Sequence, residues 1–107
     1  MMNREDVAPD AEAAFHYDTS NDFFKLWLDP SMTYSCAYFA TGSESLEEAQ
    51  MAKLDRAFDW VNLQRGDRLL DIGCGWGAAA ERAVQRYGAS AVGLTVSPEQ
   101  FELARRR

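Results

Sequence analysis

The fold of this chain is decided by the stretch Leu69-Leu70-Asp71-Ile72-Gly73-Cys74-Gly75-Trp76-Gly77. An apolar run ends in an acid, glycines follow at alternate positions, and an alanine-rich segment begins at Ala78. This order is typical of a buried strand, a tight turn and a helix. The helix would present unpaired N–H groups and its positive dipole end to whatever occupies the turn. The stretch therefore predicts a nucleotide-binding turn.

Each glycine of the turn has an expected task. Gly73 allows a sharp exit from the strand, Gly75 lets a ligand approach bare backbone, and Gly77 lets the helix and the strand pack closely. A strand-to-helix turn without a ligand is the alternative. We disfavour it because ordered glycines together with an acid exceed what a turn alone requires.

The spacing Gly73-x-Gly75-x-x-Ala78 also fits the fingerprint of a dinucleotide site. However, a dinucleotide site expects an acid about 20 residues later to hold the ribose, and residues 91–95 contain none. The carboxylate of Asp71 would also repel a pyrophosphate. A cationic ligand suits this carboxylate better, so S-adenosylmethionine, with its sulfonium and ammonium groups, is the predicted cofactor. A dinucleotide-dependent oxidoreductase is the disfavoured alternative.

The composition is that of one small globular domain. The chain has 107 residues, of which 47% are hydrophobic, and its net charge is -6. No basic stripe with interleaved aromatic residues is present, so no nucleic-acid partner is expected. The basic end at residues 105–107 is expected to be a solvated helix face. Peripheral contact of this end with an anionic membrane is the lesser alternative.

The cysteines and the first residues bear on the cellular compartment. Cys36 and Cys74 match no zinc spacing and give no disulfide framework. The first twenty residues are acidic and lack a continuous apolar run, so neither a signal peptide nor a transmembrane segment is expected. These features predict a cytoplasmic protein. The only histidine, His16, is expected to have a structural role rather than a catalytic one.

The first half of the chain predicts covering helices. Residues 11–17 predict a short helix, and an apolar helix follows until Asp29-Pro30. Residues 32–39 predict an irregular, mostly extended segment. Ser45 and Glu48 form a capping box that starts a longer helix. Its predicted apolar face comprises Leu46, Met51, Leu54, Phe58 and Val61, and its predicted solvated face comprises Glu47, Glu48, Lys53, Asp55, Arg56 and Asp59.

The second half predicts a strand, a helix, a strand and a helix. The first helix should end near Tyr87 with Gly88 after it, and the second strand should span residues 91–94. Ser97 caps the last helix, and Gln100 is predicted to complete a second capping box. This order is the start of a doubly wound α/β sheet. Because a two-stranded sheet has two open edges, we expect the chain to be the front part of a larger domain.

These features together resemble one family, the cyclopropane fatty acid synthases and mycolic acid methyltransferases. The likeness runs from about Phe15 onward, and the matching segments are residues 16–18, 20–24, 32–39, 70–77 and 93–97, with Gln100. The glycine turn alone is common to methyltransferases, whereas its combination with residues 34–39 is specific. The resemblance implies a class I, Rossmann-like methyltransferase fold. Residues 1–64 would be the helical cover and lid, and residues 65–107 the first β-α-β-α unit of the cofactor-binding domain.

The resemblance also implies site residues. Thr95 stands where many methyltransferases have an acid that binds the ribose, and Cys36 is implied to help hold a bicarbonate ion, largely through main-chain groups. The residues implied to bind S-adenosylmethionine are Tyr34, Ser35, Asp71, Gly73, Cys74, Gly75, Trp76, Gly77, Thr95 and Gln100.

The implied reaction is methyl transfer to a cis double bond of a lipid acyl chain. Loss of a proton to bicarbonate would then close a cyclopropane ring, although relatives in the family give hydroxylated or branched products. The acyl substrate would be a phospholipid or a carrier-bound mycolic precursor. Much of the family's catalytic equipment lies beyond residue 107, so a non-catalytic cofactor-binding module, or a partner of a full-length homologue, stays open as the alternative.

Overall fold

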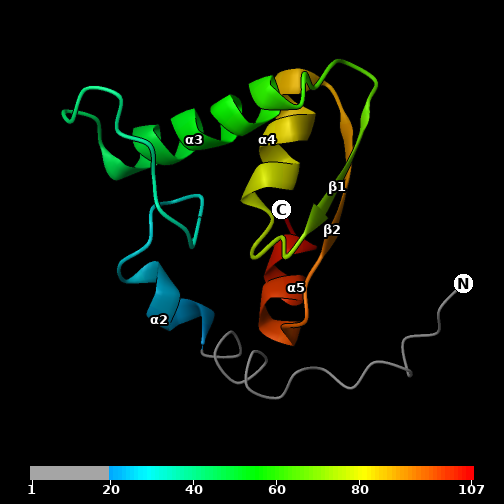
Figure 1. Cartoon of the computed structure of the whole chain (residues 1–107). Coiled ribbons are helices and arrows are strands. Elements are labelled where there is room, and N and C mark those ends of the chain that lie inside the picture. The colour runs from blue at the N-terminus through cyan, green and yellow to red at the C-terminus, as the bar shows by residue number, and fades with distance from the viewer. Residues whose placement is uncertain (1–19) are drawn as a thin grey trace, which may run out of the picture.

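The computed structural model describes residues 20–107, so the predicted helix over residues 11–17 and His16 lie outside the described residues. The order of elements confirms the predicted succession of strand, helix, strand and helix after a helical cover (Figure 1). The elements are α2 (Asn21–Lys25), α3 (Leu46–Trp60), β1 (Arg68–Ile72), α4 (Ala78–Tyr87), β2 (Ser90–Leu94) and α5 (Pro98–Ala104).

The two strands form a parallel sheet with Arg68 opposite Ser90 and Ile72 opposite Leu94. Helix α4 connects the strands and runs along one face of the sheet (Figure 1). Within residues 20–107, the opposite face is open to solvent. Its apolar side chains are between 50% and 77% exposed: Leu70, Ile72, Val92 and Leu94. The described part is thus an α/β unit with one covered and one uncovered sheet face.

Helix α3 begins as the sequence predicts. The Ser45 Oγ accepts from the Glu48 N–H at 3.2 Å, and the Glu48 Oε2 accepts from the Ser45 N–H at 2.8 Å. Its apolar face is narrower than predicted, because Leu46 is 41% exposed and Val61 is 66% exposed. An apolar position is buried only where another element lies opposite. The N-terminal end of α3 extends past α4 (Figure 1), and Val61 is the C-cap residue that follows the helix. The buried positions of α3 are Ala49, Gln50, Leu54 and Phe58.

The main core lies between α3, α4 and the sheet. Its buried members are Leu54, Phe58, Leu63, Ala78, Ala83 and Ala89. Small alanines on α4 let this helix approach closely, while Phe58 meets the ring of Tyr87 edge-on at 5.2 Å between centroids. The core therefore fixes the angle between α3 and the turn that precedes α4.

Asp55 was predicted to lie on the solvated face of α3, but it forms an ion pair with Arg82 of α4. The Asp55 carboxylate accepts from Arg82 Nε at 2.9 Å and from Arg82 Nη2 at 2.7 Å. The Tyr87 hydroxyl also donates to Asp55 Oδ1 at 3.2 Å. These hydrogen bonds, those from Arg82 first, hold the pKa of Asp55 below its ordinary value. Sequence periodicity placed Asp55 on the solvent side, but α4 supplies a partner there.

We expect Asp55→Asn to lower the free energy of unfolding by about 1–3 kcal/mol at neutral pH, because Arg82 loses its charged partner. The depressed folded-state pKa means that the pair stabilises the fold above the unfolded-state pKa of about 3.9. This contribution disappears as the pH falls through the lower folded-state pKa. Urea unfolding between pH 7 and pH 2 measures both effects. Asp59→Asn, exposed on the same helix, is the control. An acid-side slope unchanged from wild type in Asp55→Asn would contradict the assignment.

A second core joins α2 to the glycine turn. Trp76 is 1% exposed and packs on Phe24 at 4.8 Å between ring centroids. Its indole Nε1 donates to Asn21 Oδ1 at 2.7 Å, and Met32 completes the buried cluster. Helix α2 ends at Lys25, earlier than predicted. The next N–H groups, of Leu26 and Trp27, donate to the carbonyls three residues earlier, which is the pattern of a tighter turn.

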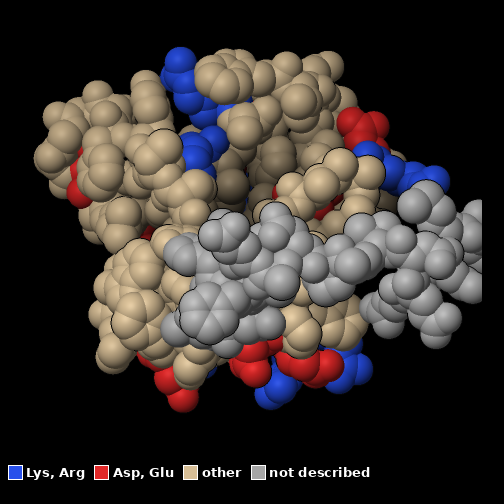
Figure 2. Space-filling model, turned by 60° about the horizontal axis from the view of Figure 1, so that its bottom comes forward, with Lys and Arg blue, Asp and Glu red and all other residues tan. Residues whose placement is uncertain are grey.

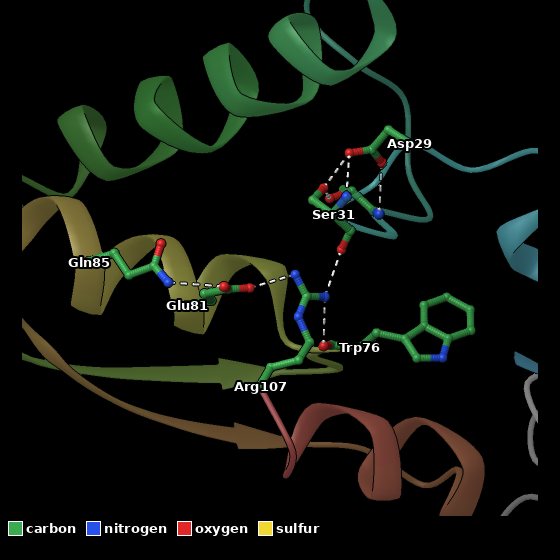
Figure 3. Close-up of polar contacts among 7 residues, drawn as sticks. Asp29, Ser31, Trp76, Glu81, Gln85 and Arg107 are labelled. Carbon is green, nitrogen blue, oxygen red and sulfur yellow. Dashed lines mark hydrogen bonds and ion pairs between the residues drawn. The ribbon is translucent and has the colours of Figure 1, made fainter.

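Arg107 ties three segments together (Figure 3). Its Nη1 donates to the carbonyl oxygens of Ser31 at 2.9 Å and Trp76 at 3.2 Å, and its Nη2 pairs with the carboxylate of Glu81. The predicted solvated basic end is thus correct for Arg105 and wrong for Arg107, whose side chain is only 23% exposed. Arg107 therefore links Ser31 to the end of the glycine turn and to α4.

Figure 2 shows Lys and Arg side chains beside acidic ones at the edges of a largely uncharged face, part of which is hollowed. In the described range, residues 20–107, no helix has the length and apolar character that crossing a bilayer requires.

Candidate functional site

A cavity of about 690 Å³ opens where the carboxyl ends of β1 and β2 meet. In α/β sheets, ligands bind outside the carboxyl ends of the strands. Three segments wall the cavity: residues 32–35, residues 71–75 and residues 94–96 with Gln100. Helix α3 and the start of α4 close the remaining sides. The predicted site residues that it brings together are Tyr34, Ser35, Asp71, Gly73, Cys74, Gly75, Thr95 and Gln100.

Three predicted site residues lie elsewhere. The side chain of Trp76 is in the second core and does not wall the cavity. Gly77 borders a smaller hollow between α4 and α5, and a Cβ there would lie 3.3 Å from the Cβ of Ala104. The close packing expected of Gly77 is therefore with α5. Cys36 is exposed and lies just past the cavity wall in sequence.

The glycine turn needs its glycines for backbone geometry. Gly73 has φ +80° and Gly75 has φ +56°, a left-handed region that favours glycine. A Cβ at either position would meet no described atom within 4 Å. Both backbones are thus open, as a surface for a ligand requires.

Gly93 is needed for a different reason. A Cβ on Gly93 would lie 2.8 Å from the Cys74 Sγ and 2.9 Å from the Cys74 Cβ. The Cys74 side chain therefore fits against bare backbone of β2, and this contact holds the turn on the sheet. Burial raises the pKa of the Cys74 thiol, and the nearby charge of Asp71 raises it further by a smaller amount.

Asp71 is the acidic side chain of the cavity wall among the described residues. Burial raises the pKa of its carboxyl group. A carboxylate that is poorly solvated gains from a cation placed beside it.

Residues 32–35 are positioned by a buried carboxylate. Asp29 is 4% exposed, and its oxygens accept from the N–H groups of Ser31 at 2.9 Å and Thr33 at 3.0 Å. The chain turns here with Met32 at φ +56°, and the predicted irregular segment follows. The turn leaves Tyr34 and Ser35 at the cavity wall.

Two side chains of α3 also hold this segment, and sequence analysis missed both. The Gln50 Nε2 donates to the carbonyls of Thr33 at 3.2 Å and Ser35 at 2.8 Å. The Lys53 Nζ donates to the Ser35 Oγ at 2.6 Å. The polar Gln50 within an apolar face was the available signal. Lys53 was predicted to lie on the solvated face, but it is half-buried and walls the cavity.

Thr95 and Gln100 interact at the far wall. The Thr95 hydroxyl donates to Gln100 Oε1 at 2.6 Å and accepts from the Ser97 N–H at 3.2 Å. Ser97 caps α5 by accepting from the Gln100 N–H, as predicted. The predicted hydrogen bond from the Ser97 N–H to the Gln100 side chain is wrong, because the Ser97 N–H donates to the Thr95 hydroxyl instead. The side chain of Gln100 is therefore at the cavity and not folded over the helix start.

Known proteins resemble this chain in sequence and in fold. The family model for mycolic acid cyclopropane synthetase matches residues 5–107. The chain belongs to this family. Cyclopropane mycolic acid synthase 2 of Mycobacterium tuberculosis is 57% identical over 96 residues, which cover 89% of this chain and 32% of the relative. The chain thus spans about a third of the length of the curated relatives that it matches.

Solved structures of methyltransferases share the fold. Mycolic acid cyclopropane synthase CmaA1, complexed with SAH and CTAB, has a TM-score of 0.90 and 50% identity over 94% of this chain and 35% of its own. Coclaurine N-methyltransferase, bound to N-methylheliamine and SAH, has a TM-score of 0.80 and 32% identity over 84% of this chain and 26% of its own. The described α/β unit of this family member is therefore part of a Rossmann-like methyltransferase fold.

Proposed function

We propose that this chain forms the cofactor-binding front of an S-adenosylmethionine-dependent methyltransferase that acts on the double bond of a lipid acyl chain. The observation that carries the proposal is the cavity beyond β1 and β2, which combines open glycine backbone with the partly buried carboxyl of Asp71. Family membership and the names of the relatives support the acyl substrate.

The proposed roles follow the walls of the cavity. Asp71 would face the cationic part of S-adenosylmethionine, and the backbone of residues 73–77 would cradle the methionine part, so Cys74, Trp76 and Gly77 contribute main-chain atoms. Thr95 and Gln100 would face the ribose and the adenine, because their paired side chains line the opposite wall. Tyr34 and Ser35 would close the cavity from the side of α3.

The cofactor would supply an activated methyl group on its sulfonium. Attack of the alkene on this methyl group would form a C–C bond, break the bond between sulfur and the methyl carbon, and leave a carbocation on the acyl chain, with SAH as the leaving group. Loss of a proton from the added methyl group would then close a cyclopropane ring. For such a leaving group the protein's main contribution is proximity and the exclusion of water. Bicarbonate held near Cys36 as the proton acceptor belongs to the same proposal, as do a cytoplasmic location and peripheral contact with membrane lipids.

Calorimetric titration of S-adenosylhomocysteine (SAH) into the purified 107-residue chain tests the proposal, with circular dichroism to establish that the chain is folded. We expect saturable binding at one site and no binding of NAD⁺. Binding of NAD⁺ without binding of SAH would favour a dinucleotide enzyme. A folded chain that binds neither would overturn the cofactor role.

A further inference from the structure

We propose that Lys53 binds the carboxylate at the amino-acid end of the S-adenosyl cofactor. The inference rests on the proposed function and deepens it. It gives a ligand-binding role to a residue of α3, outside the glycine turn.

Position is the first support. Lys53 walls the same cavity as Asp71, and within residues 20–107 they are its one basic and one acidic side chain. One comes from the covering helix α3 and the other from β1. An amino-acid group carries one positive and one negative charge. A cavity with one carboxylate and one ammonium matches both ends of such a zwitterion.

The second support is that the Lys53 ammonium has donors to spare. An ammonium has three donors, and the Lys53 Nζ uses one of them on the Ser35 Oγ at 2.6 Å. Among residues 20–107 it has no other hydrogen bond and no carboxylate within ion-pair distance. The nearby carboxylate of Asp29 is already engaged by N–H groups of Ser31 and Thr33. The remaining donors are available to an anion in the cavity.

The third support is the partial burial of the Lys53 ammonium group, which favours an anionic ligand beside it. Burial lowers the pKa of Lys53, and the opposing effects of Cys36 and Asp29 are smaller. A bound carboxylate would stabilise the charged form of Lys53, which burial destabilises. Holding Ser35 does not require a partly buried charge, since Gln50 already donates to the Ser35 carbonyl at 2.8 Å.

Calorimetry with two ligands tests the proposal on the full chain. The ligands are SAH and its decarboxylated analogue, S-adenosyl-3-thiopropylamine. We expect Lys53→Met to weaken SAH binding about 10- to 100-fold, the range for a lost charged hydrogen bond, and to change binding of the analogue less than about twofold. Lys53→Arg keeps the charge and should retain most of the SAH affinity. Lys25→Met, on the exposed face of α2, is the control and should change neither.

Three outcomes would overturn the role of Lys53. Equal losses for both ligands in Lys53→Met, reproduced by Ser35→Ala, would mean that Lys53 only positions Ser35. Unchanged SAH affinity in Lys53→Met would remove any role in binding. Bicarbonate is titrated into the chain already saturated with SAH: if it binds, and Lys53→Met abolishes this binding, Lys53 binds bicarbonate and not the cofactor carboxylate. If the wild-type chain binds neither ligand, the cofactor proposal itself fails.

Discussion

Gly75→Val is expected to weaken SAH binding by at least about 100-fold while the chain stays folded. Gly75 has φ +56°, and a β-branched residue in this region costs about 1–3 kcal/mol. More important for binding, the new side chain would enter the cavity, because Gly75 walls it and no described atom lies within 4 Å of a Cβ there. Calorimetry measures the affinity, and urea unfolding measures the stability.

Gly42→Val is a matched control for this change. Gly42 has φ +86° and equally open surroundings, and it lies outside the cavity wall in the loop before α3. The two variants should therefore lose similar stability, but only Gly75→Val should lose binding. Equal affinities of the two variants for SAH would contradict a ligand surface at Gly75.

Trp76→Ala is expected to have the largest effect on stability, about 3–5 kcal/mol, the usual cost of removing a buried tryptophan. The substitution removes the packing on Phe24 and the indole donor to Asn21 Oδ1. Both contacts attach α2 to the glycine turn. Since small domains are stable by only about 5–15 kcal/mol, much of the variant population should unfold at moderate urea. Unfolding followed by circular dichroism gives the difference in free energy.

Trp60→Ala is the control for this prediction, because Trp60 is 76% exposed. Its cost should be within about 0.5 kcal/mol. Trp76→Phe should cost less than Trp76→Ala, since it keeps an aromatic ring beside Phe24 while it loses the donor to Asn21 and part of the indole volume. Trp76→Ala and Trp60→Ala that unfold at the same urea concentration would show that Trp76 does not anchor α2.

Trp76 and Lys53 show why a motif does not assign each side chain its role. Trp76 stands inside the glycine stretch, yet its side chain serves a core built with α2. Lys53 belongs to no motif, and helical periodicity predicted that it faces solvent, yet it walls the cavity. Periodicity along one helix identifies faces, but it does not identify which other segment lies against each face.

Within residues 20–107, local sequence signals predicted the elements and their order. Local signals were sufficient for the capping box at Ser45, the left-handed Gly88 after α4 and the turn after β1. Each depends on residues close in the chain, whose backbone preferences and hydrogen bonds act over a few positions. The glycine turn with Asp71 likewise predicted the cavity at the ends of the strands.

Which distant side chains meet depends on how the elements pack. Gln50 and Lys53 contact residues 33–35 across a loop, Asp55 pairs with Arg82 between two helices, and Cys74 needs bare backbone at Gly93. The choice of Thr95 over Gln100 as the partner of the Ser97 N–H was also settled in space. Such contacts depend on how the elements pack, because burial and the distance between charges are properties of the assembled fold.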